Sequence, residues 1–263
     1  MTNGQVTAQV CPKCKGRGYI TYLESSKNHK DVYGDREFDL EYVRKCDACN
    51  GFKATAEDLT NVPDEYREAC LPKFNWDIYG IDLNGRKRIA ESFFKDFKKW
   101  ADKSNGLYIY SKTAGSGKTF LACCLGKSVM MKYNLRFKFI TAPDYFDKVS
   151  EGYALQKQGV GGSSPADIYK ECELLVFDDI GAQMDKAWQS QELFKLINER
   201  VNRGLVTIYT SNVQLTKLNI DERIKSRILG TTIEFPMPEV PIREIKQRSN
   251  QNDFLNKVLK GEG

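Results

Sequence analysis

The chain has 263 residues, of which 41% are hydrophobic and 29% charged, and its formal net charge is +5. No apolar run approaches the roughly 20 residues that a membrane-spanning helix needs, so we expect a cytoplasmic protein with no membrane partner. The mild positive charge permits a nucleic-acid-binding patch without indicating one. The length suffices for one large domain or two modest ones.

Two pairs of cysteines with the spacing C-x-x-C lie near the N-terminus, at Cys11 and Cys14 and at Cys46 and Cys49. In a cytosolic chain, paired cysteines favour a metal site over disulfides. Four thiolates on two tight turns complete the closed tetrahedral site that is typical of structural Zn²⁺. We therefore predict a zinc-binding domain over residues 1–57, with a strand leading into the second pair.

Residues 58–80 have the composition of a linker. Proline and acids at residues 63–71 predict a short helix. Residues 73–79 are aromatic and are expected to be extended, so they either fold over a bound base or pack against the next domain. Beyond the linker, residues 86–103 predict a basic amphipathic helix, whose charged face is either solvated or contacts phosphates.

The most informative stretch is L-Y-I-Y-S-K-T-A-G-S-G-K-T, which begins at Leu107. A buried strand, a glycine-rich turn and an apolar helix follow one another, which is the layout of a phosphate-binding loop. The motif usually has glycine where this chain has Lys112. We expect Lys118 to reach the outer phosphates of ATP and Thr119 to ligate Mg²⁺. The predicted nucleotide-binding residues are Gly115, Ser116, Gly117, Lys118, Thr119 and Phe120.

A second apolar strand, E-L-L-V-F, ends in two adjacent acids, Asp178 and Asp179. An ATPase needs one carboxylate to hold the Mg²⁺ shell and another to polarise the attacking water. We assign Asp178 to the metal and Asp179 to the water. Glutamate is common at the second position, and because aspartate is shorter, either the water lies closer to the carboxylate or hydrolysis is slow.

Three further polar residues are candidates for catalysis. Asn212 follows the buried strand L-V-T-I-Y-T and could orient the water beside the γ-phosphate. Arg223 and Arg227 lie on one face of a predicted helix, where an arginine of a ring ATPase would reach the nucleotide of the neighbouring subunit. We favour Arg227 as this arginine finger, with Arg223 as the alternative.

The order of strands, loops and helices over residues 81–263 predicts an α/β domain with a doubly wound parallel sheet. The sequence motifs, taken together with the cysteine pairs, resemble the AAA+ helicase loaders of the DnaC/DnaI type from bacteria and their phages. The likeness rests on C-P-K-C…C-D-A-C, A-G-S-G-K-T, L-L-V-F-D-D-I-G-A, T-S-N and D-E-R-I-K-S-R-I. It implies an AAA+ P-loop ATPase with a reduced lid, and Arg243 resembles the second-sensor arginine of these proteins.

The resemblance also implies a function. The zinc domain would bind a DnaB-type hexameric replicative helicase, and the AAA+ part would bind ATP and single-stranded DNA and associate with further copies of itself. Such a loader places the helicase on DNA during replication initiation. Two alternatives remain open: a transposition helper ATPase of the IstB type, and a weakly hydrolysing, nucleotide-gated zinc adaptor.

Overall fold

The computed structural model describes residues 13, 19–25, 39–45, 62–159, 164–181 and 187–259. Cys11, Cys14, Cys46 and Cys49 therefore lie outside the described residues, and the predicted zinc site with them. Within the described part of the chain, no cluster of metal-binding side chains is found. No helix there is both long and apolar enough to cross a bilayer.

Two strands near the N-terminus form an antiparallel hairpin, β1 (Tyr19–Ser25) and β2 (Asp39–Lys45). The predicted strand before the second cysteine pair corresponds to β2. The hairpin register pairs Tyr19 with Lys45. Tyr19 follows the first cysteine pair along the chain, and Lys45 immediately precedes the second pair.

The body of the protein contains a parallel sheet of five strands in the order β4-β5-β6-β3-β7. The strands are β3 (Gly106–Tyr110), β4 (Phe137–Thr141), β5 (Leu174–Asp178), β6 (Val206–Ser211) and β7 (Thr232–Pro236). The predicted doubly wound α/β architecture is confirmed. The carboxyl ends of β3, β6 and β5 are neighbours, so the segments that follow these three strands meet at one edge of the sheet.

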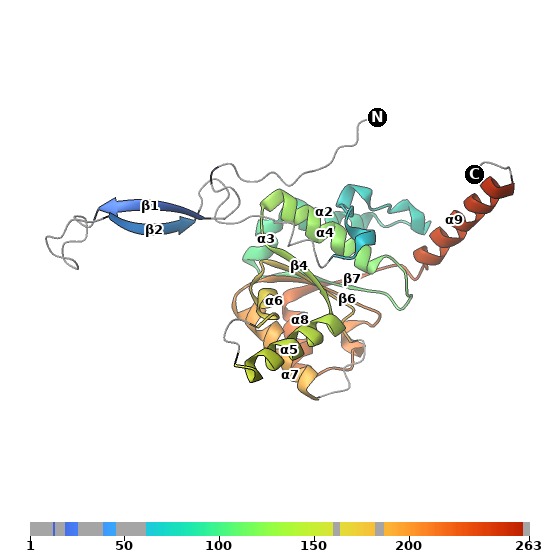
Figure 1. Cartoon of the computed structure of the whole chain (residues 1–263). Coiled ribbons are helices and arrows are strands. Elements are labelled where there is room, and N and C mark those ends of the chain that lie inside the picture. Colours follow the sequence, from blue (N-terminus) through green and yellow to red (C-terminus); the bar gives the residue numbers. More distant parts are fainter. Residues whose placement is uncertain are drawn as a thin grey trace.

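Helices cover both faces of this sheet (Figure 1). On one face lie α2 (Asn84–Lys95), α3 (Phe97–Asp102) and α4 (Lys118–Tyr133). On the other lie α5 (Ala142–Lys157), α6 (Asp167–Glu171), α7 (Ala187–Asn202) and α8 (Glu222–Thr231). Successive strand residues alternate between the two faces, so Leu107 and Ile109 join one core and Tyr108 the other.

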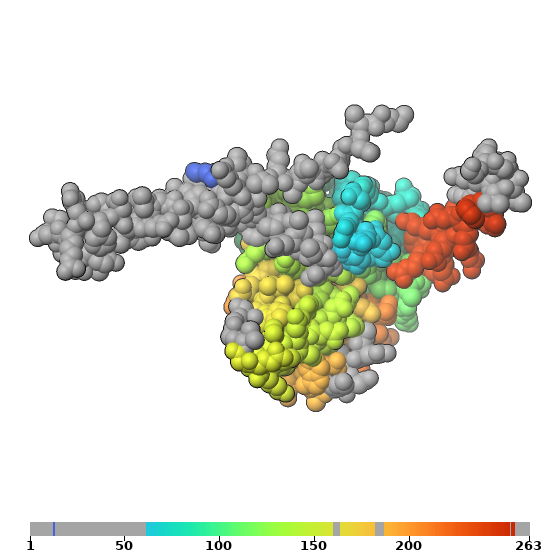
Figure 2. Space-filling model, in the orientation of Figure 1, coloured from blue at the N-terminus to red at the C-terminus, as the bar shows by residue number. Residues whose placement is uncertain are grey.

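One long helix, α9 (Ile242–Leu259), follows β7 and extends away from the body (Figures 1 and 2). Its first residue, Ile242, is buried in the core on the α4 side of the sheet. The reduced lid that the resemblance implies stays a prediction. The buried end of α9 brings its first turn beside the loop that follows β3.

Three local predictions before β3 are wrong. Residues 63–71 do not form one helix, because the 3₁₀ turns η3 (Asp64–Tyr66) and η4 (Leu71–Lys73) stand there. Residues 73–79 are not extended throughout, because their end forms η5 (Asp77–Tyr79). The basic helix expected at residues 86–103 is broken at Asp96, between α2 and α3.

From residue 62 onward, the segment that we expected to be a linker packs on the core. Its buried side chains are Val62, Ala69, Leu71, Phe74 and Tyr79. Figure 2 shows this segment seated on the body beside the base of α9. Of the two arrangements left open for the aromatic residues, the structure shows packing against the domain surface.

Arg200 is the largest fully buried side chain and lies on α7 with 1% of its surface exposed. Its guanidinium donates to the carbonyl oxygens of Tyr169, Cys172 and Val206 at 2.7, 2.9 and 2.6 Å, and to the Thr207 hydroxyl at 2.9 Å. Each of these acceptors would lose this donor on substitution. Arg200 therefore joins α6, α7 and β6.

We expect Arg200→Ala to lower the free energy of unfolding by about 3 kcal/mol or more, because buried acceptors would be left without donors. Arg200→Lys should recover little, since an ammonium cannot span these acceptors as a planar fork does. Urea unfolding followed by circular dichroism measures both. Arg203→Ala is the control, because Arg203 is an exposed, ion-paired residue near the same helix end and should cost less than about 1 kcal/mol. Equal losses at the two positions would contradict this account.

Candidate nucleotide-binding site

The loop between β3 and α4 has the conformation that a phosphate cradle requires. Gly115 and Gly117 adopt φ angles of 71° and 90°, which disfavour residues with side chains. A Cβ at Gly115 would lie 2.8 Å from the Cβ of Arg243, and one at Gly117 would lie 2.7 Å from the hydroxyl of Tyr79. The loop therefore depends on both glycines, and α4 begins directly after it at Lys118.

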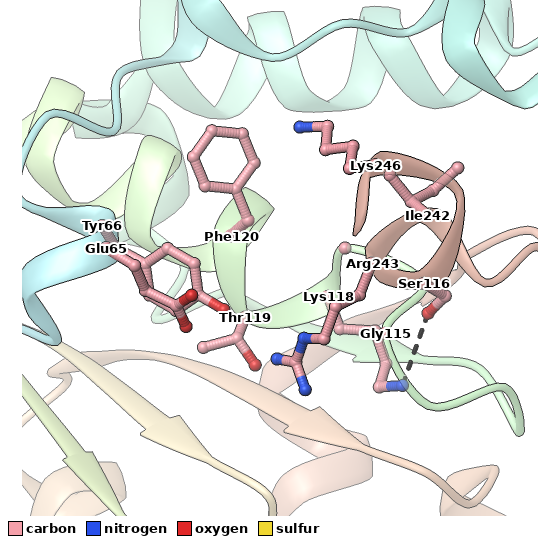
Figure 3. Close-up of a pocket in the computed structure, with 11 residues that line it drawn as sticks. Glu65, Tyr66, Gly115, Ser116, Lys118, Thr119, Phe120, Ile242, Arg243 and Lys246 are labelled. Carbon is pink, nitrogen blue, oxygen red and sulfur yellow. Dashed lines mark hydrogen bonds between the residues drawn. The ribbon is translucent and has the colours of Figure 1, made fainter. Parts of the chain in front are cut away.

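The ammonium of Lys118 lies across the loop. It donates to the carbonyl oxygens of Ser111 and Thr113 at 3.2 and 3.0 Å. It also contacts the hydroxyl of Ser116 at 3.4 Å, as Figure 3 shows. Burial lowers the pKa of Lys118, although the carboxylates of Asp179, Glu239 and Asp178 oppose the shift. A triphosphate bound here would compensate the buried charge.

Asp178 lies at the carboxyl end of β5, close to the first turn of α4. It accepts hydrogen bonds from the hydroxyl of Thr210, at 2.6 Å, and from that of Thr119. Burial nevertheless raises the pKa of Asp178 above its usual value. A buried carboxylate beside a threonine hydroxyl offers the hard oxygen ligands that Mg²⁺ prefers. These two side chains thus fit the predicted metal site.

Asp179 is held in an unusual backbone conformation, with φ of 58°. Its N–H donates to the Thr210 hydroxyl at 2.9 Å, and its carboxylate accepts from the Asn212 amide at 3.2 Å. Strained residues of this kind persist where the surrounding structure holds them in place. The structure therefore brings together Asp178, Asp179 and Asn212, which sequence analysis assigned to one site.

A cavity of about 250 Å³ opens beside the glycine-rich loop. Figure 3 shows Tyr66 and Phe120 on one side and Ile242 and Lys246 on the other, with Arg243 reaching between them toward Thr119. The rings of Tyr66 and Phe120 lie 5.8 Å apart. The apolar and aromatic walls suit a planar base, and the loop suits its phosphates.

Four of the lining residues were missed by sequence analysis: Glu65, Tyr66, Ile242 and Lys246. Tyr66 lies in the segment expected to be a linker, and burial followed by its hydrogen bond with Glu65 raises its pKa to about 12. Arg243 was predicted, and its N–H donates to the Gly115 carbonyl at 3.0 Å. The hydrophobic spacing of the sequence gave no signal for the four missed residues.

The segment before α2 also contacts the loop. The Tyr79 hydroxyl donates to the Ser116 carbonyl at 2.7 Å, and burial raises the pKa of Tyr79. The ring of Phe74 lies 5.8 Å from that of Phe120. The chain that leads from the N-terminal residues into the α/β body is thus in direct contact with the phosphate-binding loop.

The two arginines of α8 are placed elsewhere. Arg227 donates to Asn198 Oδ1 through Nε and Nη2 at 2.9 and 2.6 Å, and Arg223 forms an ion pair with Asp221. Both guanidinium groups lie over the ring of Phe194, at 5.0 Å for Arg223 and 4.9 Å for Arg227. Neither arginine is among the residues that line the cavity described above.

Comparisons with known proteins agree with this geometry. The sequence pattern of the family described as "IstB-like ATP binding protein" matches residues 69–231. The chromosomal replication initiator protein DnaA of Neisseria meningitidis serogroup B is 28% identical over 83% of this chain, which spans 44% of that relative. The chain therefore spans less than half of that relative's length.

Two further matches concern helicase loaders. The replicative helicase loader DnaI of Bacillus subtilis is 26% identical over 77% of this chain and 64% of its own length. A crystal structure of the DnaC helicase loader superposes with a TM-score of 0.56 at 20% identity, covering 67% of this chain and all of that one. At that identity, the structural match supports the AAA+ fold alone.

Proposed function

Because this chain belongs to the family of IstB-like ATP-binding proteins, we propose that it is an AAA+ ATPase that loads a replicative helicase onto single-stranded DNA. The observation that carries the proposal is that Lys118, Thr119 and Arg243 line one cavity, while the buried carboxylate of Asp178 accepts a hydrogen bond from the Thr119 hydroxyl. A buried ammonium, a buried carboxylate and a second cation are what a magnesium–triphosphate complex requires.

In this mechanism each residue has a role in binding or hydrolysis. Lys118 and the main chain from Gly115 bind the β- and γ-phosphates. Thr119 and Asp178 would hold Mg²⁺, which would neutralise developing charge. Asp179 and Asn212 orient the attacking water, and Arg243 contacts the nucleotide from α9. Arg227, or in its place Arg223, completes the site of a neighbouring copy.

The choice of a loader among AAA+ proteins rests on two features. One is the similarity to DnaI, a protein named as a replicative helicase loader. The other is the pair of C-x-x-C motifs, which we assign to a Zn²⁺ site formed by Cys11, Cys14, Cys46 and Cys49. The hairpin supports this assignment, because its register brings Tyr19 and Lys45 together, next to the two cysteine pairs in sequence. We propose that this zinc domain, at residues 1–57, binds a DnaB-type hexameric helicase in the cytoplasm.

A transposition helper of the IstB type is the second candidate, favoured by the family match over residues 69–231. The cysteine pairs are the feature that distinguishes the two. Co-purification of the full chain with a DnaB-type hexamer, with and without ATP, followed by a loading assay on circular single-stranded DNA, tests the first candidate. A chain that fails to bind the helicase in either state is not its loader. A chain that binds it and loads without ATP turnover is instead the nucleotide-gated adaptor.

We expect Cys46→Ser to release Zn²⁺ and to abolish helicase binding while ATP affinity is unchanged, because three thiolates leave a structural zinc site open. Metal content by mass spectrometry and helicase pull-down measure the two effects. Cys70→Ser is the control, since Cys70 is a free cysteine in the α/β body. Wild-type protein that contains no zinc would contradict the assignment.

A further inference from the structure

Glu239 lies in the short connection between β7 and α9, and its carboxylate binds the start of the phosphate-binding loop. It accepts hydrogen bonds from the main-chain N–H groups of Lys112 and Thr113, at 2.9 and 2.7 Å. The hydroxyls of Thr113 and Ser111 add two more, at 2.7 and 3.0 Å. One carboxylate thus satisfies four donors on three consecutive residues.

Two of these three residues, Ser111 and Thr113, also bind Lys118. Its ammonium donates to the carbonyl oxygens of Ser111 and Thr113, and it also experiences the charge of Glu239. The turn formed by residues 111–113 is therefore held between a carboxylate and an ammonium. Whatever fixes this turn also fixes the position from which Lys118 approaches a phosphate.

Two main-chain hydrogen bonds extend this contact on either side of Glu239. The N–H of Met237 donates to the Tyr110 carbonyl at 2.7 Å, and that of Arg243 donates to the Gly115 carbonyl at 3.0 Å. The connection from residue 237 to 243 therefore runs along the loop from the end of β3 to the first glycine. Glu239 lies in the middle of this contact, and Arg243 at its end reaches the cavity.

A carboxylate this close to a triphosphate site is electrostatically unfavourable for ligand binding, so its presence needs a compensating role. Burial alone would raise the pKa of Glu239, but hydrogen bonds from Thr113, Lys112 and Ser111 outweigh it and lower the pKa to about 2. The group is thus ionised at neutral pH. The N–H groups that it binds belong to residues 112 and 113, which precede the glycines that cradle the phosphates.

We propose that Glu239 is a positioning residue for nucleotide binding, which holds residues 111–113 so that Lys118 is presented to the outer phosphates. This role includes the main chain of Lys112, which stands where the loop motif usually has glycine. The inference rests on ATP binding in the cavity, as proposed above. Glu239 itself touches no part of the nucleotide in this scheme.

The test compares Glu239→Gln with Glu244→Gln, which removes the same charge from an exposed residue in the first turn of α9. Isothermal calorimetry with ATP and ADP, and displacement of a fluorescent nucleotide by adenosine, give the affinities. For Glu239→Gln we expect ATP and ADP to bind about tenfold more weakly or worse, with adenosine little changed. Glu239→Asp, which keeps the carboxylate, should recover part of the loss. Glu244→Gln should match the wild type for all three ligands.

Each outcome decides one question. Equal ATP affinity in Glu239→Gln and the wild type overturns the inference and leaves the proposed function standing. Equal loss for ATP and adenosine, together with a lower melting temperature of the free protein, makes Glu239 a structural residue and also overturns it. Wild-type protein that does not bind ATP refutes the proposed function itself.

Discussion

Lys118→Ala is expected to weaken ATP binding by about a hundredfold or more, because a charged donor to the outer phosphates is removed from a buried position. Lys118 has only 8% of its surface exposed, and its hydrogen bonds to the Ser111 and Thr113 carbonyl oxygens hold its ammonium within the loop. Calorimetry with ATP measures the effect directly. Helicase loading should be lost as well, whereas binding of the helicase through the zinc domain should remain.

Lys112→Ala provides the matched control in the same loop. The side chain of Lys112 is exposed, and only its main-chain N–H bonds with Glu239, so alanine keeps that contact. We expect ATP affinity within about twofold of the wild type, as for an ordinary surface substitution. If Lys112→Ala were as damaging as Lys118→Ala, the assignment of Lys118 to the phosphates would be wrong.

Arg227→Ala is expected to lower DNA-stimulated ATP turnover by about a thousandfold, which is within the range of arginine fingers supplied by a neighbouring subunit. ATP affinity of the monomer should not change, because Arg227 binds Asn198 and packs on Phe194 within its own chain. Turnover by a phosphate-release assay and affinity by calorimetry separate the two effects. A large loss of monomer affinity would place Arg227 in its own nucleotide site.

A mixing experiment tests directly whether the arginine acts on a neighbour. Subunits carrying Lys118→Ala keep the arginine and lack a working loop, while subunits carrying Arg227→Ala keep the loop. If the arginine acts between subunits, a mixture of the two inactive proteins should regain turnover. No recovery in mixtures that demonstrably co-assemble would argue against a finger in trans, and the same pair of tests with Arg223→Ala decides between the two arginines.

In the structure, both arginines contact helix α7, which the sequence did not reveal. Phe194 and Asn198 both lie on α7, and Asn198 binds Arg227 by two hydrogen bonds. The helical spacing of Arg223 and Arg227 was visible in the sequence, because residues four apart share a face. Their contact with a different helix was not, because it depends on how α7 and α8 pack together.

Those parts of this protein that are built from contiguous residues could be predicted from the sequence. The loop from Gly115 to Thr119 and the acids after β5 each combine a buried strand with an abrupt change to small or charged residues, and that change is local. The same locality explains why a helix was predicted directly after the loop, where α4 begins at Lys118. Local propensity failed at residues 63–71, where packing against the core produced two 3₁₀ turns in place of a helix.

Tertiary structure alone decided what surrounds that loop. Tyr66 and Tyr79 come from the segment before β3, whereas Glu239, Ile242 and Lys246 come from beyond β7. Sequence separations of roughly fifty to more than a hundred residues lie between some of these groups and the loop, and no periodic pattern encodes such contacts. These contacts form because the buried side chains of residues 62–79 and of α9 share one core with α4. The hydrophobic effect is non-directional, but by packing these segments together it brings their polar side chains to the loop.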